Sequence, residues 1–232
     1  MDEAHEYDYS IFEENFSLPL AKHDTDSKTK EQILLIATIH FAKNGYSAVT
    51  MRDIAKIVGI QQSSIYNHFE SKEVLWKEVL DHATNLYMLY FDQLEQAVAK
   101  AQSFEEVLEL ILHEAKQMRN AFTCYAFSMI QAEQFRNEDA QRVFCDTFLN
   151  YSIDFIQGCF DRCVARCFVA AFDTRTVATI IMHTTLIEIE VSVHKRDNHA
   201  QVALEDPNVV LSNLQRFILQ TVAPRKDDTP ST

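Results

Sequence analysis

Apolar residues recur at helical spacing from near Lys28 onward. Ile33, Ala37 and Phe41 lie at i, i+4 and i+8, so they share one face of a helix. Gly45 follows this pattern, and glycine suits the left-handed conformation that often ends a helix. The pattern predicts a helix that ends just before Gly45.

Two short helices are predicted next. Thr50 and Asp53 have the spacing of a capping box, which opens a helix, and Gly59 ends that helix. A third helix is expected from Gln61 or Gln62 to about residue 68. Three helices of this kind, with a turn between the short ones, are typical of a helix-turn-helix.

The remainder of the chain is also predicted to be helical. Ser71 can cap a long helix that reaches about residue 101, and Asn137, Asp173 and Asp206 can cap later ones. The clearest period is formed by Phe104, Val107, Leu108, Ile111, Leu112 and Ala115. Residues 187–193 alternate with period two, as a half-buried strand would. We predict helix there because no partner strand is visible, and the expected fold class is all-α.

Composition agrees with a helical, globular protein. Of 232 residues, 47% are hydrophobic, while 3 are glycine and 4 are proline, which argues against an architecture rich in tight turns. No run of 18 uncharged apolar residues occurs, and the acidic N-terminus lacks a signal-peptide pattern. We therefore expect a cytoplasmic protein without a membrane span.

Charge divides the chain unevenly. The net charge is −13, but the charges are unevenly placed. Residues 28–72 carry six basic and three acidic side chains, whereas residues 1–27 carry one basic and eight acidic side chains. This distribution suggests a small DNA-reading module on an acidic body. We expect an acidic arm over 1–27, a DNA-binding domain over 28–72, a larger domain over 73–223 and a tail over 224–232. The arm is either flexible or docked on the body through its aromatic residues.

The third helix carries side chains suited to reading DNA. Glutamine, asparagine and serine can hydrogen-bond base edges, while tyrosine, histidine and lysine can reach phosphates. The free N–H groups of the helix that Thr50 opens can hold a phosphate. The candidate DNA contacts are Thr50, Arg52, Gln61, Gln62, Ser63, Ser64, Tyr66, Asn67, His68 and Lys72. The alternative is a solvated polar helix that reads nothing.

The run from Thr50 to Leu75 closely resembles the DNA-binding signature of the TetR/AcrR repressors. About twelve specified positions match in register, among them Gly59, Tyr66 and the segment His68-Phe69. The resemblance is specific over about residues 28–76. Gln61 departs from it, since family members often begin this helix with serine or threonine. Gln62 and Ser63 also depart, because many members have a basic residue and then a glycine there.

The resemblance implies a homodimer and a ligand cavity. The dimer would use two C-terminal helices, over about 174–195 and 207–222, with Met182, Leu186, Ile189, Val193, Val210, Leu214 and Phe217 at the interface. The cavity would take a hydrophobic or aromatic effector among His82, Leu86, Tyr90, His113, Phe122, Tyr125, Ala126, Phe148, Phe155 and His183. Both sets have an ordinary alternative, namely core and surface residues of one subunit, and for the cavity residues we favour it.

Cys159, Cys163 and Cys167 lie at i, i+4 and i+8 and would share a helix face. An intrahelical disulfide would be strained, because residues at this spacing have Cβ atoms about 5–6 Å apart and a disulfide needs about 3.8 Å. The five cysteines are odd in number and are expected to be free thiols in a reducing cytosol. A thiol-based redox switch stays open as an alternative.

The leading hypothesis is therefore a transcriptional repressor that a small molecule releases from a palindromic operator. The alternatives are a family relative that acts as a protein-binding adaptor and a thiol-based sensor. No phosphate loop, paired-histidine metal motif or nucleophile elbow occurs, so we expect neither an enzyme nor a bound cofactor or metal.

Overall fold

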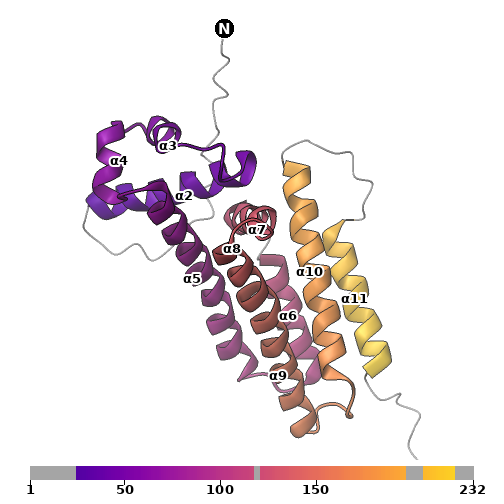
Figure 1. The fold of residues 1–232 in the computed structure, drawn as a ribbon. Coiled ribbons are helices and arrows are strands. Elements are labelled where there is room, and N and C mark those ends of the chain that lie inside the picture. The colour runs from indigo at the N-terminus through magenta and orange to yellow at the C-terminus, as the bar shows by residue number, and fades with distance from the viewer. Residues whose placement is uncertain (1–24, 118–120, 197–205, 223–232) are drawn as a thin grey trace, which may run out of the picture.

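The computed structural model describes residues 25–117, 121–196 and 206–222, and all its regular elements are helices (Figure 1). Three helices form the N-terminal domain: α2 (Thr25–Asn44), α3 (Met51–Val58) and α4 (Gln62–His68). The long helix α5 (Lys72–Val98) leads from this domain into the body. The predicted all-α class is confirmed over the described residues.

The body contains the remaining helices. They are α6 (Phe104–Gln117), α7 (Ala121–Glu133), α8 (Glu138–Arg142), η1 (Val143–Tyr151), α9 (Ser152–Ala165), α10 (Thr174–Arg196) and α11 (Pro207–Val222). In Figure 1, α10 and α11 lie side by side at one edge of the body, while α7 lies beneath the N-terminal domain and packs on α2.

The predicted helix starts are confirmed by their hydrogen bonds. The Thr50 and Asp53 side chains cap each other's backbone N–H groups, and Ser71 accepts from the Val74 N–H at the start of α5. Asn137 accepts from the Ala140 N–H in the same way. These starts were predictable because capping depends on neighbouring residues alone.

Two elements differ from the expectation. Helix α2 begins at Thr25, three residues inside the segment expected to be an arm. Residues 143–151 form a π-helix within a continuous helical rod that joins α8 to α9. The period-two stretch 187–193 is helical, as predicted, and belongs to α10.

Helix α10 is long and unusually apolar. Over Thr174–Val193 its mean hydropathy is 1.4, so by length and composition it resembles a membrane span. It nevertheless contains Glu188 and Glu190, and it packs on α7, α9 and α11. Only 39% of the apolar window is buried inside the subunit, which leaves much of this helix exposed.

Candidate nucleic-acid interface

Helix α3 packs on α2 and on α4 through a few apolar side chains. Ile54 and Ala55 of α3 and Ile65 of α4 are buried in the same core as Phe41. Gly59 ends α3 with φ +80°, in the left-handed region that glycine tolerates without strain. This turn lets α4 cross α3 with Ile65 inward, so the opposite face of α4 points to solvent.

The outer face of α4 is polar and accessible. Gln61, Gln62, Ser63, Tyr66 and Asn67 are exposed, and Ser64 and His68 are half-buried. In Figure 1, α3 and α4 lie at one end of the molecule, beside the first turns of α5. Side chains arranged in this way can hydrogen-bond base edges in a major groove without first being uncovered.

Gln61 occupies the N-cap of α4 and makes no side-chain capping bond. A serine or threonine there would accept from a backbone N–H group, as Thr50 does at α3. The departure from the family signature therefore leaves the amide of Gln61 free to face a ligand. The first turn of α4 is correspondingly less stabilised than that of α3.

Thr50 is engaged with Asp53. Its hydroxyl donates to Asp53 Oδ2 at 2.6 Å, while the Asp53 N–H donates back to the Thr50 hydroxyl at 3.2 Å. The bond from Thr50 lowers the pKa of the Asp53 carboxyl, which stays ionised at the start of α3. Arg52 is exposed beside this pair and offers a positive charge to a phosphate.

Lys72 has a structural role that the sequence did not reveal. Its Nζ donates to the carbonyl oxygens of Tyr46 and Val49 at 2.8 and 2.9 Å, and it lies 4.2 Å from the centroid of the Tyr46 ring. Two of the three ammonium donors are therefore directed into the protein. Lys72 therefore braces the loop before α3, and its contact with a phosphate stays a prediction.

Comparison with known proteins agrees with this geometry. Residues 33–79, which span the second half of α2, α3, α4 and the start of α5, match the family described as bacterial regulatory proteins, tetR family. Residues 33–79 therefore carry a DNA-binding domain of the TetR family. The fold agrees beyond the matched segment, although sequence identity there is low.

Two curated relatives match part of this chain. A transcriptional repressor named KstR2 from Rhodococcus jostii is 42% identical over 64 residues, which are 27% of this chain and 31% of the relative. The biofilm operon negative regulator IcaR from Staphylococcus aureus is 34% identical over 64 residues, covering 26% and 34% of the two chains. The chain thus matches about a third of the length of these relatives.

Solved structures extend the likeness to the body. A TetR regulator from Chloroflexus aurantiacus has a TM-score of 0.65 at 19% identity, covering 85% of this chain and 97% of its own. The ketosteroid regulator KstR2 of Mycobacterium tuberculosis has a TM-score of 0.61 at 18% identity, covering 84% and 95%. These likenesses show that the chain shares its fold with these regulators over 84–85% of its length.

The aromatic residues expected to line a cavity pack mainly on one another. The Tyr87 ring lies 4.3 Å from Phe148, and Phe91 lies 5.0 Å from Phe155, between ring centroids. Phe122, Ala126 and Phe148 are buried, Leu86, Tyr90, Tyr125 and Phe155 are partly buried, and His113 and His183 are exposed. These contacts favour the core interpretation over a preformed cavity at these positions.

His82 differs from the other expected polar residues of the cavity. Its ring packs edge-on against Phe122 at 5.7 Å between centroids, and its Nε2 has no hydrogen-bond partner in the part of the chain that the structure describes. Burial lowers the pKa of His82, so it is neutral at physiological pH. A neutral imidazole packed against the Phe122 ring agrees with the core interpretation of His82.

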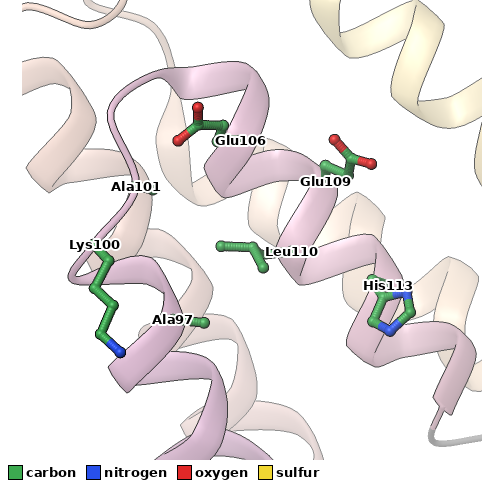
Figure 2. Close-up of a pocket in the computed structure, with 7 residues that line it drawn as sticks. All are labelled: Ala97, Lys100, Ala101, Glu106, Glu109, Leu110 and His113. Carbon is green, nitrogen blue, oxygen red and sulfur yellow. The ribbon is translucent and has the colours of Figure 1, made fainter.

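Two hollows of about 360 Å³ each lie elsewhere in the body. Figure 2 shows the first, where Lys100 of the loop after α5 and Glu106, Leu110 and His113 of α6 face a shared space. Of the residues expected to line a cavity, His113 is the one that borders it. Its charged lining differs from the aromatic site we expected.

The expected dimer residues fall into two groups. Met182, Leu186 and Ile189 are buried within the subunit, so they cannot supply the surface of an interface, and we correct that part of the expectation. Phe217 of α11 is 59% exposed, and Val193, Val210 and Leu214 are partly buried. The exposed apolar residues of these two helices are Ile180, Ile187, Val209 and Phe217.

The three cysteines do not share a helix. Helix α9 ends at Ala165, and Cys167 lies beyond it with φ 57°, a conformation that usually selects glycine. Cys159 and Cys163 are buried, and desolvation raises the pKa of Cys159 to about 12 and also raises that of Cys163. Protonated, buried thiols are poor nucleophiles, which argues against a redox role for Cys159 and Cys163, whereas Cys167 is exposed.

Proposed function

We propose that this protein is a transcriptional repressor that binds double-stranded operator DNA with α4 in the major groove. The observation that carries the proposal is the outer face of α4, where amides and hydroxyls are exposed on a completed helix-turn-helix core. The names of two relatives support repression rather than activation, because KstR2 is a repressor and IcaR is a negative regulator.

Individual side chains then take distinct roles. Gln62 and Asn67 are exposed near opposite ends of α4, and their amides suit base edges. Arg52, Tyr66 and the N-terminus of α3 would contact phosphates and set the register. Because α3 and α4 expose few basic groups, we expect a shallow dependence of affinity on salt.

The operator-binding form is proposed to be a dimer of this chain. Ile180 and Ile187 of α10, with Val209 and Phe217 of α11, offer an exposed apolar surface on adjacent helices. A second copy related by twofold symmetry would cover this surface and place two α4 helices in successive major grooves, about 34–36 Å apart. The operator should then be a palindrome.

A small, largely hydrophobic effector is proposed to release the DNA. The titles of neighbouring structures give the precedent: one is a fatty acid degradation regulator from Bacillus halodurans and another a ketosteroid regulator. Such a ligand acts only through its differential affinity for the free and DNA-bound conformations. We also propose that the protein works in the cytoplasm, where its operator lies.

The test is selection of duplexes from a random pool by the purified protein, followed by affinity measurement over a range of salt. We expect a palindromic consensus with half-sites one helical turn apart. Failure to enrich any sequence over repeated rounds would contradict operator binding. Enrichment of an asymmetric site would contradict the dimer but leave DNA reading in place.

A further inference from the structure

The loop between α2 and α3 determines where the DNA-reading helices lie. Gly45 begins this loop with φ +79°, and its N–H donates to the Phe41 carbonyl at 2.8 Å. Thr50 ends the loop as the N-cap of α3. A shift of the residues between them would move α3, and α4 would follow because it packs on α3.

The backbone N–H and carbonyl groups of Tyr46, which lies in this loop, are both held by charged side chains from other helices. The Tyr46 N–H donates to Glu133 Oε1 at 2.9 Å, and the Tyr46 carbonyl accepts from Lys72 Nζ at 2.8 Å. Glu133 is the last residue of α7, whereas Lys72 is the first residue of α5. The loop is thus tied to two separate elements by charges of opposite sign.

The ring of Tyr46 is fixed as well. Its centroid lies 4.9 Å from that of Trp76 on α5 and 5.5 Å from that of Phe41 on α2, and Lys72 lies over its face. Tilted ring contacts and a cation over the ring stabilise this position. Tyr46 therefore cannot shift alone without disturbing both neighbouring helices.

Glu133 is placed to respond to any movement of α7. Only 6% of the residue is exposed, and a buried carboxylate is costly unless it is hydrogen-bonded. Its own carbonyl accepts from the N–H groups of Arg136 and Asn137, which fixes its backbone at the end of α7. A Cβ on Gly45 would lie 3.5 Å from Glu133 Oε1, so α7 approaches the loop closely.

We propose that Glu133 is a positioning residue that ties the DNA-reading helices to the body through α7. This inference rests on the proposed DNA binding, and it adds a second connection to the one made by α5. A change in the body that displaces the end of α7 would pull on the Tyr46 N–H and reorient α3 and α4. The aromatic core that contacts α7 would in this way affect DNA affinity.

Amide hydrogen exchange, followed residue by residue with NMR, tests the hydrogen bond between Glu133 and the Tyr46 N–H without DNA. In the unaltered protein we expect the Tyr46 N–H to exchange slowly, like amides of α2. Glu133→Met keeps the bulk but removes the acceptor, and should speed this exchange about tenfold, the effect of losing one charge-assisted bond. Glu133→Gln keeps an acceptor oxygen and should preserve protection. Glu138→Met, at an exposed glutamate in the first turn of α8, is the matched control.

Operator affinity of the same variants tests the consequence. Glu133→Met should weaken binding about tenfold, whereas Glu133→Gln and Glu138→Met should stay near the unaltered protein. Rapid exchange of Tyr46 in the unaltered protein would overturn the proposal, even if Glu133→Met does not fold. Faster exchange with undiminished affinity would also overturn it. If no duplex binds the unaltered protein, the proposed function fails. The exchange data still decide whether the Glu133 carboxylate holds the Tyr46 N–H.

Discussion

Lys72 directs two of its ammonium donors to carbonyl oxygens of the loop before α3. We expect Lys72→Met to lower the free energy of unfolding by about 2 kcal/mol, because two charge-assisted bonds are lost and their acceptors are left partly buried. Urea unfolding of the purified variant measures this. Lys77→Met, at an exposed lysine of α5, should change stability by less than about 0.5 kcal/mol. Equal stability of both variants would contradict the bracing role.

The Thr50–Asp53 pair predicts a dependence on pH. The pKa of Asp53 is lowered in the folded chain, chiefly by the hydrogen bond from Thr50. A carboxyl with a lowered folded pKa stabilises the fold above its unfolded pKa of about 4, and that contribution disappears as pH falls through the folded value. Asp53→Asn should therefore be less stable than the unaltered protein at neutral pH. The difference should shrink in acid, as measured by urea unfolding, and a constant difference would contradict this.

At the scale of the element, α4 combines one buried residue with a polar outer face. Ile65 anchors the helix, so Gln62 and Asn67 can be changed without disturbing its packing. We expect Gln62→Ala and Asn67→Ala to relax sequence preference at one or two base pairs each, with a loss of about 1–3 kcal/mol per base contact. Repeating the duplex selection with each variant measures this. An unchanged consensus would exclude that residue from base reading. Lys56→Ala on α3 is the control, because it removes a charge outside α4 and should leave the consensus unchanged.

Helix α10 illustrates that periodicity alone does not show whether an apolar face packs into the subunit core or against a partner. Met182, Leu186 and Ile189 form an apolar stripe that could equally face the subunit core or a partner. The structure turns this stripe inward and leaves Ile180 and Ile187 outside. The π-helix over Val143–Tyr151 was likewise not predicted, because this rare conformation has no signal in the capping and periodicity rules.

At the scale of the whole molecule, the exposed residues of α10 and α11 predict the assembly. Replacing Ile187 and Phe217 together with aspartate should give monomers, since each introduces a charge into the proposed apolar interface. Light scattering measures the mass in solution. Leu89→Asp on α5, where the leucine is 44% exposed, is the control and should remain dimeric. A dimer that survives the double change would move the interface elsewhere.

The sequence by itself determined the features that depend on neighbours in the chain. Helix starts at Thr50, Ser71 and Asn137 follow from capping, and the turn at Gly59 follows from backbone freedom. The DNA-binding signature could be recognised because its buried and exposed positions lie within one short segment. Local rules of this kind need no knowledge of distant contacts.

The tertiary structure decided what depends on residues far apart in the chain. Glu133 meets Tyr46 across 87 positions, and no spacing rule connects an acid at the end of one helix with a loop that distant. The same holds for Lys72, whose carbonyl acceptors lie in the loop before α3. Helical periodicity shows that a face is apolar, but only packing selects which neighbour covers it, because burial depends on the whole arrangement of helices.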